Sequence, residues 1–380
     1  MRPSMSIFLE YYQIVLVALC FFQATQSIPP FPHGIGKHAD AEDFDSSFIA
    51  LKMFGSSEGM GWTTNKIPNL EGRVAIVTGA NSGIGYFTAL ELARHGAKTY
   101  LACRNPGLAE EAINKIRAIV PGSDLRFLKL DITSLNSAHS AAQEFIKSEE
   151  RLDILVNNAA IAFKPYELSE DGIELQLCNA IGHFAFTIPL LDLLKKTSKD
   201  PESHVRIVNV SSVAHSWVLG TPDFSSVENL NKHSYCPIDR YGLSKLMNIL
   251  FTNELQRRLS NTNVICASTY PGGVNTKLIA GISVKNYPIL KNLGWLTSRT
   301  LLTPKDGAIT SLYAATALEV EEKDLRSAYF CPFGVAAKPS KLAQDRDLAK
   351  KFWELCEKLV KEKIKSLSPA HLKISIHPGK

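Results

Sequence analysis

Residues 73–85, RVAIVTGANSGIG, decide the fold. The stretch begins with a short apolar, β-branched run of the kind that forms a buried strand. Closely spaced glycines follow, and apolar residues then recur at helical spacing over 86–95 until Gly96 supplies a stop. The stretch therefore predicts a strand, a tight glycine-rich turn and a helix.

The alternation of short apolar runs and helical patterns continues along the chain. Further strands are expected near residues 99–102, 124–130, 152–156, 205–210, 263–269 and 328–330, with helices at 109–119, 135–147, 179–194, 241–259 and 304–318. Because several strands are continuously apolar, the sheet must be covered on both faces. The prediction is an α/β fold: a doubly wound (Rossmann), seven-stranded, mostly parallel sheet with helices on both faces.

The domain organisation follows from composition. No repeat or break divides residues 70–345, so we assign them to one domain. Residues 29–69 are rich in Gly, Ser, His and Pro and are expected to be a linker or arm. Residues 346–380 are assigned to a C-terminal helix and tail, with a charged amphipathic helix over 341–366 packed on the domain edge.

The first 28 residues stand apart. An apolar run over 11–22 follows a weakly basic start and is shorter than the roughly 20 residues that a spanning helix needs. A cleaved signal peptide and a short membrane anchor both fit. The N-x-S/T sequon at Asn209 lies in an expected buried strand, so it gives no support to a luminal address. The location is left open between the endoplasmic reticulum or another membrane and the cytoplasm.

The overall composition excludes several classes of protein. Hydrophobic residues make up 45% and charged residues 21%, as in soluble globular enzymes. The net charge of +5 is mild and the basic residues are spread along the chain, which argues against a nucleic-acid partner. The seven cysteines include no CxxC pair and no zinc spacing, so we expect free thiols in a reducing compartment and no metal site.

The turn at 78–85 has the features of a phosphate-binding loop. Its glycines let the backbone approach a pyrophosphate, and the following helix presents free N–H groups and the positive end of its dipole. A glycine-rich turn without a ligand is the alternative. The place of this turn between the first strand and helix of the domain favours a dinucleotide.

Four motifs in order extend this pattern: TGANSGIG at 78–85, NNAA at 157–160, Ser211-Ser212 after the fifth strand, and YGLSK at 241–245. Together they resemble the short-chain dehydrogenase/reductase family over about residues 70–340. Within that family LACR at 101–104, NAIGHF at 179–184 and NVSSVAH at 209–215 are most similar to the retinol dehydrogenase and WW-domain oxidoreductase type, although no WW domain is evident. The resemblance implies hydride transfer between a nicotinamide dinucleotide and a carbonyl or alcohol.

The predicted catalytic residues are Asn179, Ser212, Tyr241 and Lys245. Tyr241 and Lys245 are one helical turn apart, so their side chains share a face. The ammonium and an oxidised nicotinamide are expected to push the phenol toward ionisation from its usual pKa of about 10. The resemblance implies that Ser212 binds the substrate oxygen, that Lys245 also bonds the nicotinamide ribose, and that Asn179 fixes a water. A bond to the backbone is the alternative for Asn179.

The end of the second strand bears on the choice of dinucleotide. A carboxylate there accepts bonds from the ribose 2′-hydroxyl, whereas an arginine pairs with a 2′-phosphate. The chain has Arg104, so NADP(H) is favoured over NAD(H), an ordinary solvated arginine being the alternative. The resemblance adds residues near the adenine, the loop after the fourth strand and the segment over the nicotinamide. The predicted cofactor-binding residues are Gly79, Asn81, Ser82, Gly83, Ile84, Gly85, Arg104, Asp131, Ile132, Asn158, Ala159, Ala160, Tyr241, Lys245, Pro271, Gly272, Val274 and Thr276.

The sequence departs from the family pattern in three places. Ala160 replaces the glycine that usually closes the NNAG motif, Ser327 stands where a glycine often precedes the last strand, and residues 216–237 form an inserted loop. We expect the added methyl group of Ala160 to be tolerated. His183 and His215 are interpreted as packing or supporting residues rather than bases, because Tyr241 already fills that role.

The substrate is expected to be a small apolar carbonyl or alcohol. Residues 277–302 mix Leu, Ile, Trp and Tyr, a composition suited to a mobile lid over such a molecule. Membrane association through the N-terminal segment and a homodimer are both left open. A catalytically idle dinucleotide-binding sensor or scaffold is the rival hypothesis, and the complete catalytic set argues against it.

Overall fold

The computed structural model of the protein describes residues 62–234, 236–275 and 301–364. Within them one sheet runs in the order β3-β2-β1-β4-β5-β6-β7-β8, and every neighbouring pair is parallel except β7 with β8. The strands are β1 (Val74–Thr78), β2 (Lys98–Cys103), β3 (Leu125–Lys129), β4 (Ile154–Asn157), β5 (Arg206–Val210), β6 (Ile265–Thr269), β7 (Tyr329–Cys331) and β8 (Val335–Ala337). The prediction of a doubly wound, mostly parallel sheet is confirmed.

The described sheet has eight strands rather than seven. The additional strand, β8, has three residues, none of them fully buried, and pairs antiparallel with β7 at the sheet edge. A reversal through Phe333 and Gly334, with φ of 65° and 82°, joins the two strands. Its three residues, Val-Ala-Ala, are too few to show a strand pattern, which is why the sequence does not reveal this strand.

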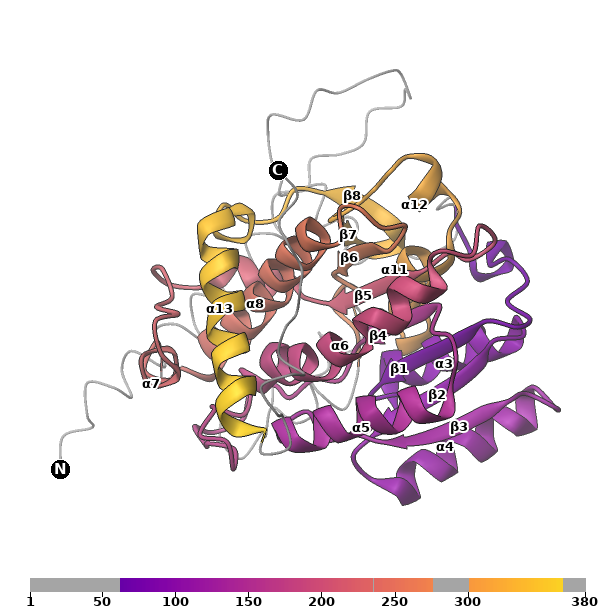
Figure 1. The fold of residues 1–380 in the computed structure, drawn as a ribbon, viewed down its shortest axis with the longest axis horizontal. Coiled ribbons are helices and arrows are strands. Elements are labelled where there is room, and N and C mark those ends of the chain that lie inside the picture. Colours follow the sequence, from indigo (N-terminus) through magenta and orange to yellow (C-terminus); the bar gives the residue numbers. More distant parts are fainter. Residues whose placement is uncertain (1–61, 235, 276–300, 365–380) are drawn as a thin grey trace. The chain divides into compact units, whose positions relative to one another are not determined.

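Helices cover both faces of the sheet (Figure 1). One face is packed by α3 (Gly83–Arg94), α4 (Pro106–Ile119) and α11 (Pro304–Thr316), whose apolar side chains form a cluster with alternate strand residues such as Ala75 and Val77. The other face is packed by α5 (Leu135–Ser148), α6 (Cys178–Thr197) and α8 (Pro237–Arg258). Two short helices, α7 (Val227–Asn231) and α12 (Glu319–Glu322), lie in connecting segments, α7 within the inserted loop.

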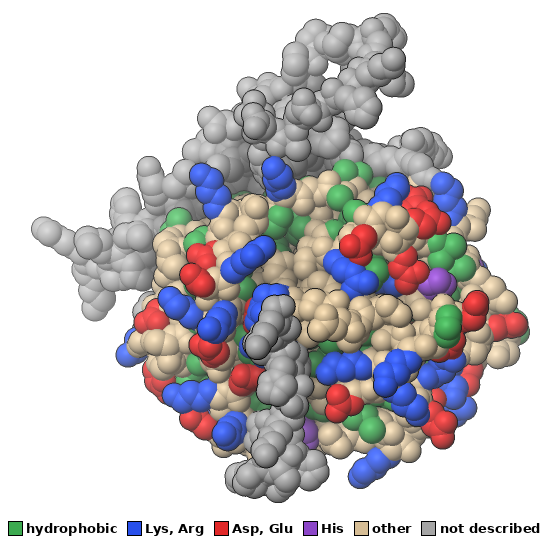
Figure 2. Space-filling view, turned by 45° about the horizontal axis from the view of Figure 1, so that its top comes forward, with side chains coloured by type: hydrophobic (Ala, Val, Ile, Leu, Met, Phe, Trp, Pro, Cys, Tyr) green, Lys and Arg blue, Asp and Glu red, His purple; other side chains and the backbone are tan. Residues whose placement is uncertain are grey.

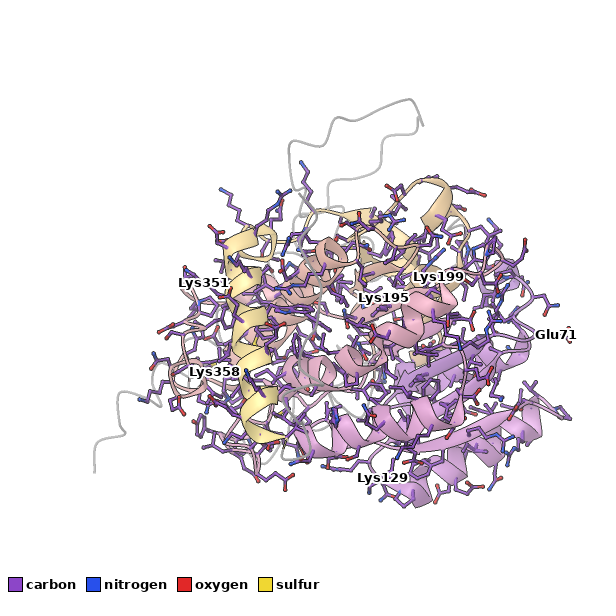
Figure 3. All side chains as sticks on the ribbon, viewed as in Figure 1. Glu71, Lys129, Lys195, Lys199, Lys351 and Lys358 are labelled. Atoms are coloured by element: carbon purple, nitrogen blue, oxygen red, sulfur yellow. The ribbon has the colours of Figure 1, made fainter. Side chains whose placement is uncertain are left out.

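The last helix, α13 (Arg346–Lys363), lies across α8 (Figure 1). Its charged outer face carries Lys351 and Lys358, which point away from the body of the protein (Figure 3). On its inner face Trp353 is fully buried, with ring centroids 4.9 Å from Phe184 of α6 and 6.0 Å from Phe251 of α8. The predicted amphipathic helix is thus present over a shorter range, and it completes the core of this layer.

The end of the expected linker is packed rather than loose. Trp62, Ile67 and Leu70 are buried in the cluster beneath α3 and α11. The indole of Trp62 meets the ring of Tyr313 edge to face, with centroids 5.5 Å apart. Isolated apolar residues in a polar stretch show no periodicity, so the sequence does not reveal this docking.

Ser327 has a φ of 58°, in the left-handed region that glycine adopts most easily. Its N–H donates to the carbonyl of Cys266, 2.9 Å away, where the chain enters β7. This conformation explains why a glycine suits the position.

Basic and acidic side chains are interspersed over the face shown in Figure 2. Several charged side chains of the described residues pair locally, such as Arg126 with Asp124 and Lys323 with Glu319. Among the described residues no helix is long and apolar enough to cross a membrane, and residues 1–28 lie outside them.

Candidate active site

The glycine turn lies at the carboxyl end of β1, where the strand order reverses between β2 and β4. Gly79 and Gly83 have φ of 66° and 59°, which glycine tolerates without strain. A Cβ on Gly85 would lie 2.5 Å from Nδ2 of Asn158 and 2.6 Å from the carbonyl oxygen of Gly79. Ser82 caps α3 without a side-chain bond to its first turn, so that side chain leaves the helix N–H groups uncovered. This backbone cradle fits a diphosphate.

The residue before the turn ties it to the loop after β4. The Thr78 hydroxyl accepts hydrogen bonds from the N–H groups of Asn158 and Ala159, each 2.8 Å away. Nδ2 of Asn158 donates to the Thr78 carbonyl, also at 2.8 Å. The predicted cofactor residues Asn158 and Ala159 are therefore fixed beside Gly79, and half-buried Ala160 follows them.

Arg104 follows β2, and Asp131 lies just beyond β3. The Arg104 side chain is 70% exposed, and its Nε is 3.9 Å from Oδ2 of Asp131, so the guanidinium is available to a ligand. The other carboxylate oxygen of Asp131 accepts from the N–H and hydroxyl of Thr133. Ile132 is buried, and its carbonyl oxygen occupies the space that a Cβ on Gly182 would need. The structure thus places these residues at adjacent strand ends, as predicted.

Ser212, Tyr241 and Lys245 meet at the carboxyl end of β5. Ser212 caps the 3-10 helix η2 (Val213–Trp217), and its hydroxyl is hydrogen-bonded to the Tyr241 phenol. Nζ of Lys245 is 5.6 Å from the Tyr241 ring centroid and donates to the carbonyl of Val210 at 2.9 Å. Because α8 begins at Pro237, Tyr241 lies in its second turn rather than at its start.

Burial controls the charge of this group. It raises the pKa of Tyr241 to about 12, although the hydrogen bond with Ser212 acts in the opposite direction. It also lowers the pKa of Lys245 to about 7. For the protein by itself, burial outweighs the hydrogen bond with Ser212 and keeps the phenol protonated. Ionisation of the phenol beside an ammonium and an oxidised nicotinamide stays a prediction.

Asn179 is fully buried on α6 and uses its side chain on the backbone. Its Oδ1 accepts from the N–H of Ile161 at 2.7 Å, and its Nδ2 donates to the Ile161 carbonyl at 2.8 Å. Nδ2 also donates to the hydroxyl of Ser244, the neighbour of Lys245, at 3.1 Å. The side-chain amide of Asn179 thus bonds the backbone, which was the alternative to its predicted role. That role, fixing a water, stays a prediction.

The segment after β6 is described as far as residue 275. Buried Pro271 is followed by Gly272, whose φ is 94°. Val274 packs beside Gly307 of α11, where a Cβ would also meet Ile84 of the glycine turn. Val274 and Ile84 thus lie beside the same residue of α11, and closure of this segment over the nicotinamide stays a prediction. Thr276 and most of the expected lid lie outside the described residues.

Two residues of this region were not predicted to be functional. Thr78 belongs to the quoted turn motif, yet nothing in the pattern shows that its hydroxyl organises the loop after β4. Phe163 has a φ of 55°, unusual for an aromatic residue, and its ring lies 5.0 Å from that of Tyr241. The sequence carries no signal for either contact.

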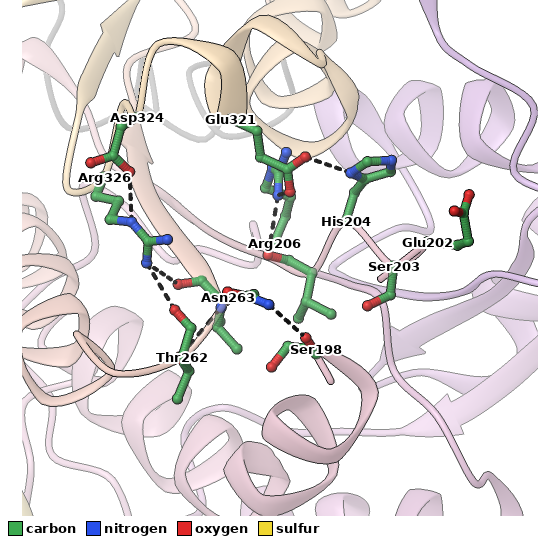
Figure 4. A network of polar contacts seen from close by, with 12 residues as sticks. Ser198, Glu202, Ser203, His204, Arg206, Thr262, Asn263, Glu321, Asp324 and Arg326 are labelled. Atoms are coloured by element: carbon green, nitrogen blue, oxygen red, sulfur yellow. Dashed lines mark hydrogen bonds and ion pairs between the residues drawn. The ribbon is translucent and has the colours of Figure 1, made fainter. Parts of the chain in front are cut away.

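A polar cavity of about 190 Å³ lies away from these residues, at the amino ends of β5 and β6 (Figure 4). Its lining groups pair with one another or with neighbours: Glu321 with His204 and Arg206, and Asp324 with Arg326. Parallel strands place this edge opposite the glycine turn. The cavity is therefore separate from the candidate active site.

Known proteins that are similar in sequence to this chain are oxidoreductases. The family profile described as short chain dehydrogenase matches residues 73–221. An uncharacterized oxidoreductase of Schizosaccharomyces pombe is 41% identical over 271 residues, 71% of this chain and 79% of that protein. Human retinol dehydrogenase 14 is 38% identical over 310 residues, 77% of this chain and 87% of that protein.

Solved structures share the fold. A protein from Mycobacterium paratuberculosis matches with a TM-score of 0.60 and 32% identity, covering 79% of this chain and 98% of that one. A Brucella melitensis 3-ketoacyl-(acyl-carrier-protein) reductase complexed with NADH matches with a TM-score of 0.52, 21% identity and coverage of 70% and 100%. Pseudomonas aeruginosa RhlG, solved with NADP, matches with a TM-score of 0.53, 22% identity and coverage of 70% and 98%. With the glycine turn and the Ser212, Tyr241 and Lys245 group in place, these likenesses show that the chain belongs to the short-chain dehydrogenase/reductase family of oxidoreductases.

Proposed function

We propose that this protein is an NADP(H)-dependent oxidoreductase that interconverts a carbonyl and an alcohol on an apolar small molecule, such as a retinoid, a lipid or a ketone. The observation that carries the proposal is the convergence of Ser212, Tyr241 and Lys245 at the carboxyl end of β5, on the same sheet edge as the glycine turn after β1. A binding-only protein has no need of this group.

The protein's own groups supply the proton chemistry. When bound, the nicotinamide supplies or accepts the hydride. With its pKa raised to about 12 by burial, Tyr241 is a phenol at neutral pH and can donate its proton to a carbonyl oxygen. Ser212, bonded to that phenol, is placed to bind the same oxygen. Lys245, with its pKa lowered to about 7 by burial, takes both charge states near neutral pH and can return the proton to Tyr241.

The surroundings of Tyr241 favour an apolar substrate. Ala162 and Ala214 form a buried cluster with its ring, and Phe163 and Trp217 pack against that cluster. A polar substrate would lose water here without gaining hydrogen bonds from the side chains of Ala162, Ala214 or Phe163. The retinol dehydrogenases among the curated relatives agree with this preference.

Loss of NADPH absorbance on a panel of carbonyl compounds tests the proposal. Retinal, long-chain aldehydes and cyclic ketones should be reduced, with kcat/KM about tenfold or more above that for small polar ketones, since each added buried CH₂ contributes roughly 0.8 kcal/mol. NADPH binding without turnover of any member of the panel would favour the sensor or scaffold instead.

Arg104 is proposed to select NADP(H) through the 2′-phosphate. Arg104→Ala should weaken NADPH binding about 10- to 100-fold, because a hydrogen bond to a charged group contributes roughly 1.5–3 kcal/mol, and should leave the Kd for NADH nearly unchanged. Fluorescence titration with both dinucleotides measures the two constants. An equal loss for both would show that Arg104 does not read the phosphate.

A further inference from the structure

His183 of α6 joins two parts of the site that lie far apart in the sequence. Its Nδ1 is 2.6 Å from the main-chain oxygen of Asn179, and its Nε2 is 2.8 Å from the hydroxyl oxygen of Thr78, 105 residues away. All three residues are buried. The imidazole therefore bridges the helix that carries Asn179 and the residue that precedes the glycine turn.

Hydrogen-bond counting at Thr78 fixes which ring nitrogen carries the proton. The hydroxyl oxygen accepts from the N–H groups of Asn158 and Ala159, which occupies both of its lone pairs. Its proton must then point to Nε2 of His183, so the ring is protonated at Nδ1 and donates to the Asn179 carbonyl. Burial lowers the pKa of His183 to about 4, the bond to Asn179 opposing this and the Lys245 charge adding to it, so the ring is neutral.

Both ends of the bridge continue to predicted site residues. Toward the cofactor, Asn158 and Ala159 lie so close to the turn that a Cβ on Gly85 would meet Nδ2 of Asn158 at 2.5 Å and one on Gly79 would meet Cα of Ala159 at 2.9 Å.

Toward the reacting centre, Nδ2 of Asn179 donates to the Ser244 hydroxyl, which in turn donates to the Tyr241 carbonyl at 2.8 Å. Two stretches of hydrogen bonds, joined through the covalent bonds of Asn179, thus connect Thr78 with the backbone of the proposed proton donor.

We propose that His183 is a positioning residue that sets the place of the glycine turn relative to Tyr241, and so the distance over which hydride is transferred. The inference rests on the proposed function. The Nε2 arm holds the turn through Thr78, and the Nδ1 arm holds Tyr241 through Asn179 and Ser244. His183 acts only through these neighbours and is not itself a catalytic residue.

Two substitutions of His183 by amide side chains of different length test its two hydrogen bonds separately. His183→Gln can present an acceptor to Thr78 but gives up the donor to Asn179, whereas His183→Asn keeps a donor near Asn179 and gives up Thr78. We expect His183→Gln to keep the Kd for NADPH while kcat falls roughly 10- to 100-fold, the cost of a misplacement of about 1 Å. His183→Asn should weaken NADPH binding more than it lowers kcat at saturating NADPH. His183→Leu should lose both.

Thr187→Val is the matched control. Thr187 lies one turn further along α6, and its buried hydroxyl accepts from Nδ2 of Asn157 at 2.9 Å, so it also ties α6 to β4. Its loss should lower Tm and change kcat by less than about twofold, because it contacts neither the turn nor Asn179. If the three His183 variants behave like this control, His183 only packs and the proposal is overturned.

The ring itself gives a readout that needs no turnover. Nitrogen-15 NMR of histidine-labelled protein should show a neutral His183 protonated at Nδ1, and a ring protonated at Nε2 or titrating near the usual pKa of about 6.5 overturns the proposal. A wild-type protein that reduces no carbonyl would refute the proposed function alone. In that case the NMR result and a double-mutant cycle of His183→Asn with Thr78→Val on the Kd for NADPH still decide on the bridge, additivity counting against it.

Discussion

Tyr241→Phe is expected to lower kcat for carbonyl reduction about 10³-fold or more, because a positioned general acid typically contributes 10²–10⁴-fold and phenylalanine has no proton to donate. The ring should stay in place, since its contacts with Phe163 and Ala162 do not involve the hydroxyl. The Kd for NADPH should therefore change little. Steady-state kinetics with the best substrate of the carbonyl panel, and fluorescence titration of NADPH, measure the two effects.

Tyr100→Phe is the control for this substitution. Tyr100 belongs to β2, and its hydroxyl donates to Glu149 at 2.6 Å. This side chain has no part in the proposed proton transfer. Removing it should affect stability and leave kcat within about twofold. A kcat that is unchanged in Tyr241→Phe but lower in Tyr100→Phe would show that Tyr241 is not the proton donor.

Glu321→Ala is expected to lower the free energy of unfolding more than any other substitution proposed for this protein. The carboxylate of Glu321 bonds Nη1 of Arg206 at 2.9 Å and Nδ1 of His204 at 2.5 Å. Arg206 is 1% exposed, and its Nε and Nη2 have no hydrogen-bond partner among the described residues. Removing Glu321 leaves this charge buried without compensation, at a cost of about 3 kcal/mol. At roughly 2–4 °C per kcal/mol the Tm should fall by about 6–12 °C.

Lys323→Ala provides the comparison at the same corner. Lys323 pairs with Glu319 at 3.2 Å, but both side chains are largely exposed. Exposed pairs contribute about 0–1 kcal/mol, so its Tm should stay close to that of the wild type in differential scanning calorimetry. Equal Tm values for the two variants would show that water reaches Arg206 and screens its charge.

Much of the fold follows from the sequence because the buried strands are short continuous apolar runs. What the pattern misses depends on tertiary contacts: β8 exists through its pairing with β7, and Trp62 is buried because Tyr313 lies across from it. The start of α8 has a local signal, Pro237 in the first turn, but that signal falls inside a segment interpreted as an inserted loop.

The sequence predicts which site residues lie together, because parallel strands bring their carboxyl ends to one edge of the sheet. That rule places the residues after β1, β2, β4 and β5 together without further information. Charge states were not predictable in this way. In the protein by itself the pKa of Tyr241 is raised because Ala162 and Ala214, from separate segments, help to bury its ring. The partner of His183 likewise depends on a contact between distant segments.

The position of Trp353 has a consequence for how the protein is made. A ribosome completes α6 and α8 well before it reaches residues 346–363, so Phe184 and Phe251 must wait for the indole that covers them. A nascent chain halted between β8 and α13, at residues 338–345, would therefore present an aromatic patch to chaperones although all the described strands of the sheet have been synthesised.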